Sequence, residues 1–268
     1  MILKQFKDFI NTPNLWESNL LEVEQFEIPE INLNLFNPKP IPQNVRLGHQ
    51  IEYIFHQLIE YSGQYRILLF NQPVKNENRT IGEIDFILKN QIDDSILHIE
   101  LTYKFYIIDE ALSNPILQLI GPNRKDSFFD KINKIKNHQF KLIQKEETIK
   151  ILKYNEIETN DIVSQACFKA QLFIPFHKKD VNITPFNKEC IYGFWIKKVD
   201  FSGIDFLYNK YYLPLKKEWL INPYENVIWK THELISIEID QQHLQLKSPM
   251  VWMKNSSNEI EKAIIVWW

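Results

Sequence analysis

The residue types best suited to catalysis fall in two short segments of the 268-residue chain, GEIDF and HIELTYKFY. Side chains alternate between the two faces of a strand, so the first segment places Glu83 and Asp85 on one face. The second segment places Glu100 and Lys104 on one face in the same way. Between them lies a turn signal, NQIDDS, and the whole predicts an antiparallel hairpin with a shared polar side.

The register of the hairpin decides how closely the acidic side chains meet. If the turn is centred between Asp93 and Asp94, Asp85 lies opposite Thr102 and diagonal to Glu100. If it is centred one residue earlier, Asp85 lies directly opposite Glu100. In both registers the two carboxylates are about 5–8 Å apart.

Two carboxylates at this separation repel each other unless one is protonated or a cation lies between them. A hard divalent cation, Mg²⁺ or Mn²⁺, binds carboxylate oxygens, retains several waters and lowers the pKa of a bound water. Lys104 would orient that water or stabilise negative charge on a phosphate. The alternative is that the acids and the lysine form the solvent-exposed face of an ordinary antiparallel hairpin.

Helices and further strands surround the predicted hairpin. A helix ending at Gly63 is indicated by apolar spacing in RLGHQIEYIFHQLIEYSG, and a short strand follows at YRILLFNQPV. After the hairpin, the stripe of Phe128, Ile132, Ile135 and Leu142 predicts a second helix. A further strand is predicted at FKAQLFIPF, so the element order is helix, three strands, helix, strand.

GEIDF and HIELTYKFY, with RLGHQIEYIF and GPNRKDSF, resemble the PD-(D/E)XK phosphodiesterase superfamily. They are similar in particular to a bacterial family of domains of unknown function assigned to it. The resemblance covers residues 46–145 most strongly and implies a restriction-endonuclease-like α/β core with a mixed sheet. It also implies Asp85 and Glu100 as metal ligands, Glu52 on the first helix as a third acidic ligand, and Glu83 as an accessory acid.

The sequence departs from the superfamily pattern at the lysine. Thr102 stands two residues after Glu100, where the pattern has lysine, and the lysine follows two residues later, at Lys104. Residues 102 and 104 share a strand face, so the long side chain of Lys104 can still reach the site.

A run of basic residues from Gly121 to Lys145 offers contacts for a nucleic acid. It holds seven Lys and Arg against two Asp, a formal charge of +5. The predicted phosphate contacts are Arg124 and Lys125 ahead of the second helix, and Lys131, Lys134 and Lys141 along it, in one stripe with His138 and Lys145. The alternative is a solvated helix face.

Composition limits the other functions open to the chain. The net charge of −3 provides no general cationic field, so a nucleic acid must bind to a local patch. Phosphate-loop motifs are absent, and Cys167 and Cys190 lack the spacing of a zinc site. With no secretory signal and no apolar stretch of about 20 residues, we expect a cytoplasmic protein with no membrane partner.

Three parts are predicted: an N-terminal helix and proline-rich arm (1–45), the PD-(D/E)XK-like core (46–178) and a mostly β C-terminal extension (179–268). The predicted function is a Mg²⁺-dependent nuclease with DNA as the favoured substrate. The alternative is a non-catalytic module that keeps the nuclease scaffold and binds nucleic acid or protein. A protein partner would bind through the C-terminal extension. The sequence does not predict an oligomeric state.

Overall fold

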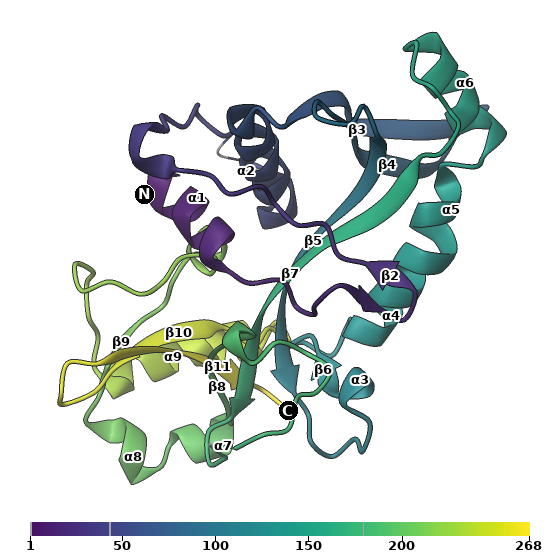
Figure 1. The fold of residues 1–268 in the computed structure, drawn as a ribbon. Helices are drawn as coiled ribbons and strands as arrows, with labels where there is room; N and C mark the ends of the chain where they lie inside the picture. The colour runs from purple at the N-terminus through teal and green to yellow at the C-terminus, as the bar shows by residue number, and fades with distance from the viewer. Residues whose placement is uncertain (1, 43, 179) are drawn as a thin grey trace. The chain divides into compact units, whose positions relative to one another are not determined.

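The computed structural model describes residues 2–42, 44–178 and 180–268 (Figure 1). The chain forms two compact units: unit 1 spans residues 1–103 and 130–169, and unit 2 spans residues 104–129 and 170–268. The predicted N-terminal arm belongs to unit 1, whereas residues 104–129 and 170–178, grouped with the core in the sequence analysis, belong to unit 2. The units divide the chain in this way because two long strands, β5 and β7, each contribute residues to both.

The fold is α/β, with a large mixed sheet whose strand order is β3-β4-β5-β7-β8-β11-β10-β9 and with β6 paired to β5. The pairs β7–β8 and β8–β11 are parallel, and β3–β4, β4–β5, β10–β11 and β9–β10 are antiparallel. Within the described ranges, no helix combines the length and apolar character that crossing a bilayer requires.

Unit 1 contains the predicted core elements in the predicted order. A helix, three strands, a further helix and a strand follow one another, and helix α6, which the sequence analysis did not identify, precedes the last strand. The bounds are α1 (Ile2–Asn11), β1 (Asn19–Leu20), β2 (Val23–Glu24), the 3-10 turn η1 (Leu33–Leu35), α2 (Leu47–Ser62), β3 (Tyr65–Asn76), β4 (Arg79–Asn90), β5 (Ile96–Ile108), α4 (Phe128–Lys134), the π-helical segment η2 (Ile135–Gln139), α5 (Phe140–Leu142), α6 (Glu146–Tyr154) and β7 (Val163–Pro175).

Helix α2 packs on one face of this sheet through its aromatic and aliphatic stripe. The rings of Phe55 and Phe86 lie 4.8 Å apart, and Ile54 and Leu58 are fully buried. The helix ends where it was predicted to end, because Gly63 takes the left-handed conformation at φ 67° and its N–H bonds to Glu60 O.

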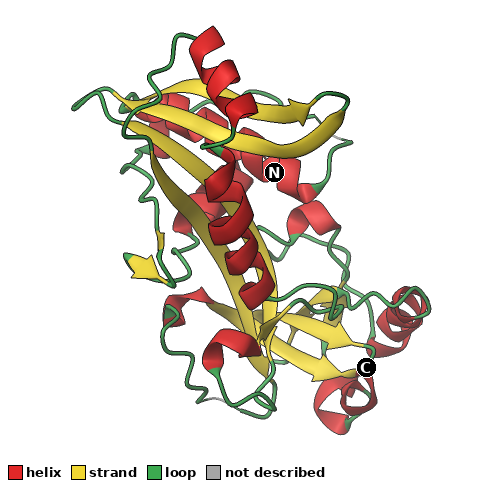
Figure 2. Cartoon of the chain, turned by 90° about the vertical axis from the view of Figure 1, so that its right-hand side faces the viewer, coloured by secondary structure: helices red, strands yellow, loops and turns green. Residues whose placement is uncertain are grey.

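A continuous helical run of α4, η2 and α5 lies along the long strands (Figure 2). Its predicted apolar stripe is confirmed, since Phe128, Ile132, Ile135 and Leu142 are all buried. In unit 1 it covers the face of β5 that carries His98, whose ring lies 6.0 Å from that of Phe140. Strand β5 is therefore buried on both faces.

The β4–β5 register is the second of the two that the sequence left open. Phe86 pairs with Ile99 and Lys89 with Ile96, so the turn is centred one residue before the Asp93–Asp94 midpoint. Continuing this register by one residue brings Asp85 opposite Glu100.

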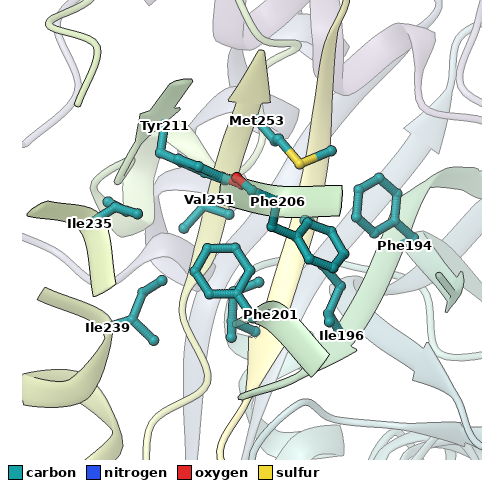
Figure 3. Packing of buried hydrophobic residues seen from close by; sticks show 11 residues of the cluster. Phe194, Ile196, Phe201, Phe206, Tyr211, Ile235, Ile239, Val251 and Met253 are labelled. Atoms are coloured by element: carbon teal, nitrogen blue, oxygen red, sulfur yellow. The ribbon is translucent and has the colours of Figure 1, made fainter. Parts of the chain in front are cut away.

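Unit 2 contains more helix than the mostly β extension predicted. Its elements are α3 (Pro115–Gln118), β6 (Leu119–Ile120), η3 (Lys188–Cys190), β8 (Ile191–Lys197), α7 (Lys198–Phe201), α8 (Ile204–Leu207), β9 (Lys210–Tyr212), η4 (Lys216–Glu218), α9 (His232–His243), β10 (Met250–Lys254) and β11 (Ile260–Val266). Its hydrophobic core joins residues of β8–β11 to residues of α7–α9 (Figure 3).

The segment LISIEI belongs to the C-terminal extension that was predicted to be mostly β, and this prediction was wrong for it because it lies in α9. Thr231 caps the helix by accepting a hydrogen bond from the N–H of Leu234 at 3.5 Å. Ile235 and Ile239, four residues apart, are fully buried, whereas Ile237 is 54% exposed. The buried positions therefore follow the helical period, although the isoleucines alternate in the sequence as they would in a strand.

Gly193 and Gly48 provide a matched pair of Gly→Ala substitutions that tests the packing of unit 2. A Cβ at Gly193 would lie 2.0 Å from the backbone oxygen of Lys262, whereas a Cβ at Gly48 would meet nothing within 4 Å. We expect Gly193→Ala to destabilise the protein by about 3 kcal/mol, because β8 and β11 must separate. Gly48→Ala should stabilise helix α2 by about 0.5 kcal/mol. Urea unfolding midpoints check both, and equal midpoints for the two variants would contradict the β8–β11 geometry.

Candidate functional site

Asp85 lies where the hydrogen-bonded ladder between β4 and β5 gives way to side-chain contacts. The ladder runs from Lys89–Ile96 to Phe86–Ile99. One residue beyond it, the Oδ2 atom of Asp85 accepts the backbone N–H of Leu101 at 2.9 Å. A carboxylate thus replaces a strand carbonyl as the acceptor, and this bond fixes Asp85 beside β5.

Glu100 is buried in the sheet of unit 1, with only 1% of its surface exposed. Its Oε1 atom accepts a hydrogen bond from Nε2 of Gln139 at 2.9 Å. Gln139 is the last residue of the π-helical segment, in which one extra residue per turn changes the direction of the side chains that follow. The π segment therefore has a definite consequence, since it contains the side chain that contacts Glu100.

The two carboxyl groups influence each other strongly. The pKa of Glu100 is raised to about 8. Burial of the carboxyl group is the largest cause, and the negative charge of Asp85 is the second. Burial also raises the pKa of Asp85 to about 6, against the lowering effect of the Leu101 N–H. At neutral pH the pair therefore holds a proton, which ionisation of both acids would release.

Glu52 and Glu83 surround this pair as further negative charges. Both raise the pKa of Asp85. Glu52, on α2, accepts hydrogen bonds through Oε2 from Nδ1 of His49 at 2.9 Å and from Nδ2 of Asn71 at 2.7 Å. In the ranges that the structure describes, no group of three or more His, Cys, Asp or Glu is arranged to hold a metal ion.

The positive charge at the acid pair comes from helix α4. Lys131 lowers the pKa of both Asp85 and Glu100, and Lys134 lowers that of Glu100. Lys104 instead donates from Nζ to Oδ2 of Asp126 at 2.7 Å within unit 2. From the sequence, Lys131 was predicted to contact the phosphate backbone of a substrate. Its effect on the pKa values of the two acids was missed.

Of the other predicted phosphate contacts, Arg124 is engaged within unit 2. Its guanidinium lies 3.6 Å above the ring of Trp268, and Nη2 contacts Oδ2 of Asp109 at 3.2 Å. Lys125 is exposed and, like Arg124, precedes helix α4. Lys134 and Lys141 belong to unit 1, where they line surface hollows.

The strand face that carries the acids is not exposed to solvent. His98, Glu100 and Thr102 are all buried, which contradicts the alternative of an ordinary wet hairpin face. Nδ1 of His98 is hydrogen-bonded to Oγ of Ser164 at 3.0 Å, and burial lowers the pKa of His98 to about 4. His98 is therefore neutral at physiological pH and serves to connect β5 to β7.

The carboxylate oxygens of the acid pair are the ligand type that a hard divalent cation prefers. Asp85 and Glu100 each give one oxygen to a protein donor, which orients the carboxylate and leaves its second oxygen as the atom a cation would take. Mg²⁺ is commonly bound by only one or two carboxylates together with waters. Two mutually repelling, buried acids are therefore a sufficient protein contribution to such a site.

A comparison with protein families gives one result. The family model described as Domain of unknown function (DUF1853) matches residues 11–265, which is nearly the whole chain. Neither the curated proteins nor the solved structures gave a match.

Replacing Glu100 by glutamine tests the burial of the acid pair through the pH dependence of stability. The folded-state pKa of Glu100, about 8, lies above its ordinary value of 4.5. The folded protein therefore retains a proton that the unfolded chain releases, and the stability of the wild type falls as pH rises through this window. Glu100→Gln keeps an acceptor for Gln139 and has no proton to lose, so its stability should fall less.

The measurement is thermal unfolding with a chelator present, from about pH 5 to pH 9. The midpoint temperature of the variant should exceed that of the wild type most at the alkaline end. Each kcal/mol of stability gained corresponds to about 2–4 °C. Parallel curves for the two proteins would show that Glu100 is ionised and solvated in the folded state.

Proposed function

Because the chain belongs to the DUF1853 family, a domain of unknown function, we propose its activity from the site itself: a divalent-metal-dependent phosphodiesterase, most simply a nuclease acting on DNA. The observation that carries this proposal is the pairing of the half-buried Asp85 with the buried Glu100, with raised pKa values and Lys131 as a nearby positive charge. Buried acids with perturbed pKa values beside a cation are characteristic of functional sites.

The element order supports a restriction-endonuclease-like core of the PD-(D/E)XK type. A helix, three antiparallel strands, a helix and a fourth strand follow one another, and the two acids stand on adjacent strands. A fold does not determine an activity, so the assignment to a nuclease depends on the acids and not on the sheet.

Each residue of the site has a defined task in this proposal. Asp85 and Glu100 would hold Mg²⁺ or Mn²⁺, and the Leu101 N–H and the Gln139 amide keep their carboxylates oriented. The cation would lower the pKa of a bound water and neutralise charge on a phosphoryl oxygen. Lys131 would stabilise negative charge that develops on the phosphate, in place of Lys104. Glu52 and Glu83 add negative potential that favours cation binding.

One observation favours a second candidate, a binding module that keeps the scaffold without turnover. Lys104, the residue expected to support the nucleophile, is paired with Asp126. If Lys131 does not replace it, the site holds a cation and a nucleic acid but lacks the positive group that cleavage needs. The two candidates differ in whether substitution of Lys131 affects a cleavage rate.

The cation site is tested by calorimetric titration of Mn²⁺ and Mg²⁺ into the wild type and Asp85→Asn. We expect binding to the wild type to release a proton near neutral pH and to tighten as pH rises through about 6 to 8, because the acids must ionise. Asp85→Asn should weaken binding at least about tenfold, within the range that altered metal sites show. Equal affinities for the two proteins would count against the metal site.

The role of Lys131 is tested by cleavage of labelled oligonucleotides with Mg²⁺. Lys131→Ala should lower the rate about 100-fold or more, as loss of a group that stabilises the transition state does. Lys136→Ala is the matched control, because Lys136 lies on the same helical run but pairs with Glu22 at 2.6 Å. If Lys104→Ala abolishes cleavage and Lys131→Ala leaves the cleavage rate unchanged, Lys104 is the residue that stabilises charge on the phosphate.

A further inference from the structure

Two adjoining hollows lie beside the acid pair on the surface of unit 1. Their volumes are about 630 and 380 Å³, and both are lined by Ile81 and by residues 137–139. Strand β4 forms one wall, and the helical run of α4, η2 and α5 forms another. Because they share these residues, the two hollows form one continuous groove, here called the helix groove.

Three lysines of unit 1 line the helix groove, Lys134, Lys141 and Lys145. In the described part of the chain, Lys134, Lys141 and Lys145 have no carboxylate within ion-pair distance. Lys136, on the same helical run but outside the groove, pairs with Glu22, and Lys150 pairs with Glu146 at 2.7 Å. Three lysines against Asp130 and Glu147 give the lining a formal charge of +1, so a phosphate would be attracted to the lysines themselves.

The remainder of the lining is suited to unpaired bases. Asn133 and Asn137 present side-chain amides, which donate and accept hydrogen bonds at base edges. Gln139 offers only its amide oxygen, because its Nε2 atom donates to Glu100 and to the backbone oxygen of Glu83. Ile81, between the two hollows, is 40% exposed and offers an apolar surface to a base. In a duplex the Watson–Crick edges are already paired, so these amides would have little to contact beyond phosphates.

Gln139 connects the helix groove to the acid pair. It lines both hollows, and its Nε2 atom donates to Oε1 of Glu100. A strand lying in the groove would therefore pass next to the side chain that orients Glu100.

We propose that the helix groove binds single-stranded nucleic acid, with phosphates at Lys134, Lys141 and Lys145 and unpaired bases at the amides. This inference rests on the proposed function, because it names the substrate class of the same site. Asp130 and Glu147 also line the groove, and Glu147 accepts a hydrogen bond from Asn76 at 2.7 Å. These acids repel phosphates, so the proposal places the phosphates at the lysines.

The test is fluorescence anisotropy of labelled oligonucleotides of about 15 nucleotides, single-stranded and duplex, with the full chain in a chelator so that no cleavage occurs. The single strand should bind at least about tenfold more tightly than the duplex at low salt. Lys134→Glu and Lys141→Glu should each weaken it about tenfold, and their combination should flatten the salt dependence by about 1.4 logarithmic units per decade of salt.

Lys136→Glu is the matched control, since it makes the same change of charge outside the groove, and it should alter affinity by less than about twofold. Asn137→Ala should reduce the preference for the single strand over the duplex. Equal binding of duplex and single strand, an equal effect of Lys136→Glu, or no binding at low salt would overturn the proposal.

Cleavage is measured separately with Mg²⁺, so the two proposals can fail independently. Groove-dependent binding of single strands without cleavage would support the helix groove and count against the nuclease. If duplex DNA is cleaved and neither Lys134→Glu nor Lys141→Glu changes the rate, the nuclease proposal is supported and the proposal that the helix groove binds single strands is contradicted.

Discussion

Burial of two carboxyl groups side by side is the constraint on which the site in unit 1 depends. Asp85 and Glu100 stand on adjacent strands, each one residue beyond the last pair of the β4–β5 ladder, and Glu100 is almost completely removed from water. Ionised carboxylates in such a place are costly unless they are hydrogen-bonded and balanced by positive charge. The neighbouring contacts address this cost, since the Leu101 N–H, the Gln139 amide and the charge of Lys131 each favour the ionised forms.

These contacts are only partial compensation, as both pKa values stay above their ordinary range. A fully neutralised pair would have low pKa values and would serve as a structural ion cluster. A pair that keeps a proton at neutral pH could exchange that proton for a cation, because the protein donors already orient each carboxylate. The proposal of a metal-dependent activity depends on this incomplete balance.

Much of this arrangement could be predicted from the sequence, because strand alternation and helical stripes are local signals. The hairpin, helix α2 with its end at Gly63 and the buried stripe of the second helix are confirmed. The register was left open between two values, since a turn of this length has no single dominant conformation, and the observed value depends on tertiary contacts. Helix α9 was misread because its isoleucines alternate, and only the cap at Thr231 indicated a helix.

The lysine illustrates why a shared face is not a shared site. Alternation correctly puts Lys104 on the same side of β5 as Glu100, but four residues of strand separate their Cα atoms by about 13 Å. At that distance Lys104 belongs to unit 2, where Asp126 binds it. The cation that acts on both acids comes instead from helix α4, since Lys131 lowers the pKa of Asp85 and of Glu100. The position of Lys131 relative to the acids depends on which face of α4 packs on the sheet and on the π segment that follows. Residue spacing alone predicts neither.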